Sequence, residues 1–133
     1  MKTTAILGAG SWGTALAIHL ARAGHAVRLW ARAEGVGDVL RARGANDRYL
    51  PDLPLGDGVA PTHSLEEALS GARFVIVAVP SHGLRAVVQR ATPHLERGAI
   101  IVSATKGIEV DTLQRMSQVI EAETAGCCRT VVL

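Results

Sequence analysis

Short apolar runs alternate along the chain with longer segments of mixed polarity, and this alternation predicts the secondary structure. Glycine, proline or charged residues flank the runs, which is typical of strands. The near-continuous apolar stretch Phe74–Val79 favours a strand that is covered on both faces of a sheet. The predicted strands are Thr3–Leu7, Ala26–Trp30, Arg73–Val79, Ala99–Ala104 and the start of another at Arg129–Leu133.

The segments between these strands have the residue spacing of helices. In the first of them, Trp12, Leu16 and Leu20 recur at every fourth position, so we expect them to share the face that packs on the sheet. Gly24 follows as a natural C-terminal stop. The predicted helices span residues 12–23, 33–43, 64–70, 83–91 and 111–124.

Two residue pairs have the spacing of a helix capping box. Ser64 is followed three residues later by Glu67, and Asp111 is followed in the same way by Gln114. A hydroxyl or carboxylate at the first position accepts a hydrogen bond from the backbone of the third residue after it. Both pairs are therefore expected to begin helices.

The region from residue 33 to residue 61 gives weaker signals. Gly35 and Gly37 lower the helix propensity of segment 33–43 by about 1 kcal/mol each. The stretch 44–61 contains three prolines and three glycines, which predicts a long irregular connection with a short strand near Val59. Connections of this length are uncommon in compact domains and are often functional.

Buried strands that alternate with helices predict a parallel sheet with helices on both faces, a doubly wound α/β fold. The chain shows no internal repeat and no domain boundary, so we expect one domain over residues 1–133. Ligands of such sheets bind beyond the carboxyl ends of the strands. The residues that directly follow each strand are therefore the candidates for a functional site.

Composition narrows the class of protein. Of the 133 residues, 48% are hydrophobic and the net charge is only +2, which argues against a disordered chain. The small charge also argues against a dedicated nucleic-acid binder, which carries a strong basic patch. The apolar runs are far shorter than the roughly 18–20 residues that span a bilayer. The N-terminus lacks a signal-peptide layout, so we expect a cytoplasmic protein.

Cysteine and histidine usage points to neither a disulfide framework nor a metal site. Cys127 and Cys128 are neighbours, and a disulfide at this spacing is strained and rare. We interpret them as two small buried side chains in or near a strand. The histidines have no metal-ligand spacing with each other or with the cysteines, and we expect no metal.

A G-x-G-x-x-G sequence ends the first predicted strand and opens the first predicted helix, which is the context in which this motif is informative. Gly8 allows the tight turn, Gly10 lets a pyrophosphate approach the backbone, and Gly13 lets the helix pack closely on the strand. The helix N-terminus then faces the phosphates. This predicts a dinucleotide site in a Rossmann-like fold, and a glycine turn without a ligand is the alternative.

Arg32 follows the second strand, where enzymes strict for NAD usually place an acid that binds the ribose 2′-OH. The nearest acid here is Glu34. A cation at this position can pair with the 2′-phosphate of NADP. The sequence therefore favours NADPH or the use of both cofactors, and a solvated surface arginine is the alternative.

Polar residues also follow the predicted strands at 73–79 and 99–104. Ser81 is interpreted as a helix cap, or as part of a segment lining the nicotinamide or substrate side of the site. His82 has no evident partner in sequence for acid–base work. Lys106, with Gly107 beside it for close approach, suits a phosphate or carbonyl ligand, and a solvated loop lysine is the alternative.

Four motifs occur in a fixed order: GAGSWGTALA at residues 8–17, Asn46 with Tyr49-Leu50-Pro51, VPSH at 79–82 and ATKG at 104–107. In order and spacing they resemble the bacterial NAD(P)-dependent glycerol-3-phosphate dehydrogenases. The resemblance covers essentially the whole chain, but only the N-terminal part of a typical family member.

This resemblance implies hydride transfer between NAD(P)H and dihydroxyacetone phosphate, giving sn-glycerol 3-phosphate for phospholipid synthesis. It implies that Ser11, Trp12, Arg32 and Tyr49 contact the dinucleotide, together with the glycine motif. It also implies that Lys106 contacts both cofactor and substrate, where its charge polarises the carbonyl. The resemblance is also compatible with a homo-oligomer of the full-length form.

The resemblance also implies parts that would follow Leu133, namely the proton-transfer lysine, a Ser-Gly-Pro motif and a helical substrate-binding domain. We therefore expect a truncated N-terminal NAD(P)-binding domain with an incomplete sheet and no catalytic residue of its own. We expect this chain alone to be inactive. Its last strand should leave an open edge that pairs readily with other chains.

Two other interpretations stay open. One is a related dehydrogenase of small hydroxy acids or sugar phosphates, against which the matches at 49–51 and 104–107 argue. The other is a standalone dinucleotide-binding or sensing module without catalysis, which the short chain favours.

Overall fold

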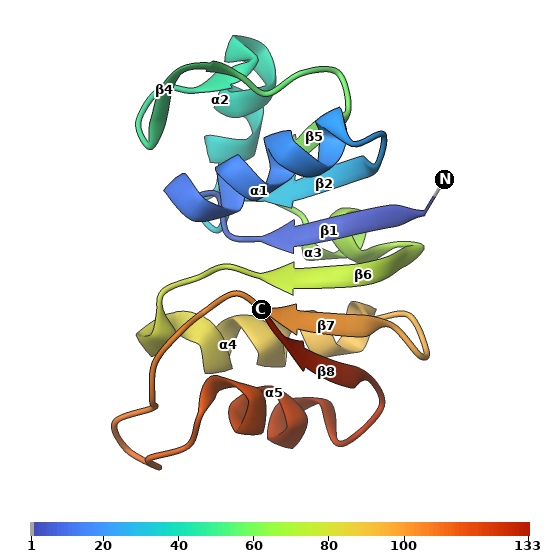
Figure 1. Cartoon of the computed structure of the whole chain (residues 1–133), viewed down its shortest axis with the longest axis vertical. Helices are drawn as coiled ribbons and strands as arrows, with labels where there is room; N and C mark the ends of the chain where they lie inside the picture. The colour runs from blue at the N-terminus through green and yellow to red at the C-terminus, as the bar shows by residue number, and fades with distance from the viewer. Residues whose placement is uncertain (1) are drawn as a thin grey trace.

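The structure, a computed structural model, describes residues 2–133 and contains a six-stranded sheet with helices on its faces (Figure 1). Every pairing in this sheet is parallel. The strands are β1 Thr3–Leu7, β2 Ala26–Trp30, β5 Val59–Thr62, β6 Ala72–Val77, β7 Ile100–Ser103 and β8 Arg129–Val132. The helices are α1 Ser11–Arg22, α2 Val36–Arg43, α3 Leu65–Leu69, α4 Ser81–Ala91 and α5 Met116–Thr124, with a 3₁₀ turn at Thr92–His94.

The order of the strands across the sheet is β5-β2-β1-β6-β7-β8. Counted along the chain this is 3-2-1-4-5-6, the order of the dinucleotide-binding Rossmann fold. The predicted doubly wound fold is therefore confirmed. The order reverses between β1 and β6, and the arrowheads of the strands point to one side of Figure 1, where the loops after β1, β6 and β7 gather. Ligands of such folds bind at this switch point.

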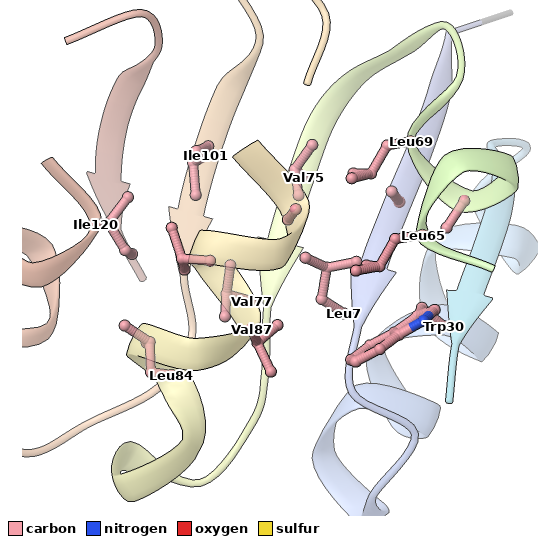
Figure 2. Close-up of a cluster of buried hydrophobic side chains, with 14 of the residues drawn as sticks. Leu7, Trp30, Leu65, Leu69, Val75, Val77, Leu84, Val87, Ile101 and Ile120 are labelled. Atoms are coloured by element: carbon pink, nitrogen blue, oxygen red, sulfur yellow. The ribbon is translucent and has the colours of Figure 1, made fainter. Parts of the chain in front are cut away.

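Alternate residues of β1 supply two cores on opposite faces of the sheet. Ala5 and Leu7 belong to the core beneath α3, α4 and α5, which Figure 2 shows with Trp30 at one side. Ile6 belongs to the core beneath α1 and α2. Each fully buried large side chain contributes about 1.5–3 kcal/mol of transfer free energy, so both layers stabilise the fold. Because side chains alternate between the two faces of the strand, β1 packs against both helix layers.

Helix α1 packs on the sheet through a different face from the predicted one. Its buried residues are Gly13, Thr14, Ala17 and Ile18, and the side chain of Trp12 is 54% exposed. Small residues face the sheet because the helix approaches it closely. The large residues at positions 16 and 20 pack only partly against the core, so the four-residue spacing identified the helix but not its buried face.

The stretch 44–61 is more ordered than predicted. Strand β3 (Ala45–Asn46) pairs antiparallel with β4 (Leu50–Pro54) to form a small second sheet. The predicted strand near Val59 is β5. Leu55 is only 3% exposed, and its N–H donates to the carbonyl of Gly44 at 2.8 Å. These tertiary contacts order a segment whose prolines and glycines predict irregularity.

One of the two predicted capping boxes is present in part. The hydroxyl of Ser64 accepts a hydrogen bond from the backbone N–H of Glu67 at 3.1 Å, and α3 follows. The prediction at Asp111 is wrong, because α5 begins only at Met116. The Gln114 side chain accepts from Arg85 at 3.0 Å instead of capping a helix, so a tertiary contact has replaced the local one.

Two smaller predictions are also corrected. Ser81 is the first residue of α4 and not its cap, because Pro80 holds the N-cap position and no side chain bonds there. Cys127 is exposed and Cys128 is only half-buried, so they are not the predicted pair of buried side chains. The two cysteines lie in the turn between α5 and β8, where the chain leaves the helix.

Candidate functional site at the carboxyl edge of the sheet

The three motif glycines occupy two kinds of environment. A Cβ atom placed at Gly8 would lie 2.3 Å from the carbonyl oxygen of Ala78, and one at Gly13 would lie 1.8 Å from the carbonyl oxygen of Gly8. Both positions therefore exclude a side chain. A Cβ at Gly10 would meet no atom within 4 Å. The loop is thus closed against the protein at Gly8 and Gly13 and is open to a ligand at Gly10.

The N-terminus of α1 carries no capping group of its own. Gly10 is the N-cap in an extended conformation, no side chain bonds to the first turn, and that turn contains no acidic residue. The first backbone N–H groups of a helix lack intrahelical acceptors, and the helix dipole places positive charge there. An anion at the open face of Gly10 would satisfy these donors.

The segment around β3 is fastened to the glycine loop by polar contacts. The buried amide of Asn46 donates to the carbonyl of Ala9 at 2.9 Å and to the hydroxyl of Thr14 at 2.8 Å. The hydroxyl of Ser11 donates to the carbonyl of Tyr49 at 2.8 Å. These bonds place the backbone of Tyr49, whose side chain is exposed, beside the start of α1. Ser11 and Tyr49, both predicted to contact a dinucleotide, are therefore brought together.

Arg32 lies after β2 at the same edge of the sheet and is exposed. Its Nη1 atom lies 3.8 Å from the position that a Cβ of Gly83 would occupy, so the guanidinium reaches the first turn of α4. None of the salt bridges within residues 2–133 involves Arg32. Its charge is thus available to an anion between β2 and α4.

Lys106 lies in the loop after β7, which is fastened to the end of β6. The hydroxyl of Thr105 donates to the carbonyl of Val79 at 2.7 Å. Gly107 has a φ of +135°, and a Cβ there would lie 3.1 Å from the Cβ of Ser81. The exposed Lys106 is therefore held close to the start of α4, next to the switch point. The strap formed by Thr105 was not predicted from the sequence.

A polar cluster behind Lys106 holds the rest of this loop. Arg85 of α4 binds Glu109 through two hydrogen bonds of 2.8 Å and also bonds to Gln114 and to Glu123 of α5. The Arg85 guanidinium, and after it the Thr112 hydroxyl, lower the pKa of Glu109 to about 2. Sequence reasoning missed this cluster because its members lie on three separate segments.

Some candidate residues gain no partner from the fold. The structure gives no hydrogen bond to the side chain of His82, which is exposed on α4. Within residues 2–133 no group of three or more histidine, cysteine or acidic side chains is placed to hold a metal ion. Two surface hollows of about 450 Å³ lie elsewhere, one lined by Arg28 and α3 and one at the amino ends of β1 and β2.

The carboxyl edge therefore combines uncapped backbone N–H groups, an open glycine and two cationic side chains, Arg32 and Lys106. Such a set recognises phosphate groups. No helix in the described part of the chain is long and apolar enough to cross a membrane.

Comparison with known proteins gives a consistent result. Residues 3–133 match the sequence family described as NAD-dependent glycerol-3-phosphate dehydrogenase N-terminus. The chain is 43% identical over 132 residues to a glycerol-3-phosphate dehydrogenase [NAD(P)+] of Moorella thermoacetica, covering 99% of this chain and 39% of that protein. It is 48% identical over 122 residues to the protein of the same name from Koribacter versatilis, covering 91% of this chain and 36% of that protein.

Solved structures agree with the sequence relatives. The crystal structure of glycerol-3-phosphate dehydrogenase from Coxiella burnetii superposes with a TM-score of 0.91 at 36% identity, covering 98% of this chain and 40% of that one. A UDP-glucose dehydrogenase from Pyrobaculum islandicum, at 22% identity and a TM-score of 0.75, shares the fold. The chain thus spans about two-fifths of the length of the relatives it matches.

Proposed function

Since the chain belongs to the NAD-dependent glycerol-3-phosphate dehydrogenase family and matches its N-terminal part, we propose that residues 1–133 act as the NAD(P)-binding domain of an oxidoreductase. The proposed reaction is hydride transfer between NAD(P)H and dihydroxyacetone phosphate, giving sn-glycerol 3-phosphate. When bound, the nicotinamide ring supplies or accepts the hydride. The family relatives favour this function over a standalone sensing module.

The observation that carries the proposal is the open face of Gly10. Its two partner glycines are closed against backbone atoms, whereas a Cβ at Gly10 would meet nothing within 4 Å. Beside it lies the uncapped N-terminus of α1. We assign the pyrophosphate to this position, because it needs backbone donors and close approach. Ser11, Trp12 and Tyr49 are the side chains that would border the bound dinucleotide.

Arg32 supports NADPH, or dual use, over strict use of NADH. Its exposed guanidinium lies between the end of β2 and the first turn of α4. It forms no ion pair with any residue in the described part of the chain. A 2′-phosphate would supply the missing anion with charge-assisted hydrogen bonds. The hydroxyl of NAD would gain much less from the same cation.

Lys106 is proposed to serve the substrate side. The strap from Thr105 to the end of β6 holds the backbone beside it, so the Lys106 side chain starts from a fixed position next to the switch point. There it would bind the phosphate of the substrate or stabilise negative charge on the carbonyl oxygen. We place the proton-transfer group in the part of the relatives that this chain does not span. We also propose a cytoplasmic location.

Tryptophan fluorescence tests this proposal on the chain as it stands. Trp12 is 54% exposed beside the glycine loop, and the carbonyl of the buried Trp30 accepts from the backbone N–H of Gly8, so both indoles are close enough to transfer energy to NADPH bound there. We expect saturable binding of one NADPH per chain, with the signal reduced in Trp12→Phe. We expect no NADPH oxidation on addition of dihydroxyacetone phosphate. Absence of saturable NADPH and NADH binding by calorimetry would contradict the proposal.

A further inference from the structure

Cys127 and Cys128 form a pair of free thiols far from the carboxyl edge of the sheet. They lie in the turn that leads into the amino end of β8, whereas the glycine loop and Lys106 lie at the opposite ends of the strands. Their Sγ atoms are 3.5 Å apart. Cys127 is exposed and Cys128 is half-buried against the core beneath α5. The two sulfur atoms are therefore close enough to bind one atom placed between them, and the sulfur of Cys127 is accessible to solvent.

The geometry favours ligation of a single atom by both sulfurs over a bond between them. A disulfide requires the sulfurs to approach to about 2.04 Å and places them at a strained vicinal spacing. Ligation by a bridging atom requires no such approach. Burial of the Cys128 thiol, and after it the hydrogen bond with Cys127, raise the pKa of Cys128 to about 11. The resulting low thiolate fraction at neutral pH disfavours oxidation by peroxide, which needs the thiolate.

The number of ligands limits the class of atom that the pair can hold. Within residues 2–133 no third histidine, cysteine or acidic side chain joins the two sulfurs in a metal-binding group. Zinc in proteins is almost always held by three or four protein ligands. A centre that takes only two ligands from the protein, and brings the third itself, fits better. Trivalent arsenic that carries one organic group is such a soft, thiophilic centre.

We propose that Cys127 and Cys128 form a binding site for monosubstituted trivalent arsenicals, in which both Sγ atoms bond to one arsenic atom. With an arsenic oxide of the form R–As=O, two S–H bonds and the arsenic–oxygen bond break, and two As–S bonds form. The two protons and the oxygen leave as one water molecule. Arsenic stays trivalent and neither sulfur is oxidised, so the step needs no oxidant.

Phenylarsine oxide and intact-mass spectrometry test this site on the 133-residue chain. We expect one phenylarsenic group per chain, retained in excess glutathione and released by 2,3-dimercaptopropanol. Joining the second sulfur to an atom already held by the first makes that step intramolecular, so retention against glutathione should exceed that of either single-cysteine variant by about 100-fold. The variants are C127S and C128S.

Folding controls keep the test decisive. C128A serves as a second variant at the half-buried position, and each variant is compared with the parent chain by thermal melting. Equal retention by the parent chain and by folded single-cysteine variants would overturn the proposal. So would a stoichiometry of two arsenic groups per chain, since each sulfur would then act alone. Zinc added in place of the arsenical should bind at least tenfold more weakly, and tighter zinc binding would also overturn it.

Discussion

The amide nitrogen of Asn46 lies 2.8 Å from the hydroxyl oxygen of Thr14, and both side chains are buried. This contact joins the first strand of the small second sheet to the helix that follows the glycine motif. The same amide nitrogen also donates to the carbonyl of Ala9 inside that motif, at 2.9 Å. The side chain of Asn46 therefore helps to fix the loop that is proposed to receive a pyrophosphate.

Replacing Asn46 by alanine should loosen the glycine loop. Loss of the amide leaves the buried hydroxyl of Thr14 without this donor, and an unsatisfied buried polar group costs about 1–3 kcal/mol. We expect Asn46→Ala to lower the free energy of unfolding by this amount, measured by urea denaturation, and to weaken NADPH binding. Asp47→Asn is the matched control, because its exposed ion pair with Arg43 contributes little. Equal effects of the two variants would contradict the assigned role of Asn46.

Replacing Arg32 by alanine should separate the two cofactors. If the guanidinium pairs with a 2′-phosphate, its loss removes charge-assisted bonds that NADPH makes and NADH lacks. We expect Arg32→Ala to raise the Kd for NADPH at least tenfold and to change the Kd for NADH by less than threefold, corresponding to about 1.4 and 0.65 kcal/mol. Calorimetric titration with each cofactor measures both constants. Parallel losses for the two cofactors would reject the NADPH preference.

The Glu109 carboxylate should make stability depend on pH in the acid range. Hydrogen bonds from Arg85 and then Thr112 lower its pKa from 4.5 to about 2 in the folded chain. Because the folded state holds this proton less tightly, its contribution to stability is present above about pH 4.5 and is lost as the pH falls toward 2.

Urea unfolding at pH 6 and pH 3 tests this dependence. Glu109→Gln should reduce the fall in stability between the two pH values, since glutamine cannot titrate. Glu121→Gln is the control, because Glu121 is an exposed residue of α5 outside the Arg85 cluster. This variant should leave the fall in stability unchanged. A pH dependence in Glu109→Gln as steep as in the parent chain would count against the pair with Arg85.

Strand β8 should promote self-association of the 133-residue chain. Within residues 2–133 it has a sheet neighbour on one side only, β7, and the side chain of its Val132 is 66% exposed. An open edge offers unpaired backbone groups to a second strand. We expect sedimentation velocity to show concentration-dependent association that Val132→Lys reduces. Val110→Lys, at an 85% exposed position away from this edge, is the control. A monomer at all concentrations would contradict the prediction.

Sequence patterns predicted the framework of this fold well, because local chemistry determines it. The runs Thr3–Leu7 and Ala26–Trp30 coincide with β1 and β2, since apolar residues bounded by glycine and charge leave few alternatives. The position of the glycine motif between β1 and α1 was predicted for the same reason. The order of strands then follows from the right-handed crossover rule and the Rossmann pattern.

Two of the three failures occur where distant side chains decide the structure, and one occurs where two adjacent residues compete for the same face. Trp12 does not pack on the sheet because Gly13 brings the helix backbone too close for a large residue. The cap predicted at Asp111 is absent because Arg85 captures Gln114. The second sheet was missed because Asn46 is fastened to the glycine loop across more than thirty residues of chain. No short window of sequence contains both partners of the contacts that Arg85 and Asn46 make.

The most direct test compares the two kinds of glycine in the motif. Gly13→Ala should unfold or severely destabilise the chain, because its Cβ would lie 1.8 Å from the carbonyl oxygen of Gly8. Gly10→Ala should fold, since its Cβ meets no atom within 4 Å and the change at an N-cap costs at most about 1 kcal/mol.

The decisive measurement is the Kd of folded Gly10→Ala for NADPH and NADH by calorimetry, beside the parent chain. If the pyrophosphate lies against Gly10, the added methyl group occupies its place. The account predicts that both constants rise at least tenfold while the melting temperature stays within a few degrees of the parent value. Unchanged affinity in the folded variant would contradict the assignment of the dinucleotide to this edge of the sheet.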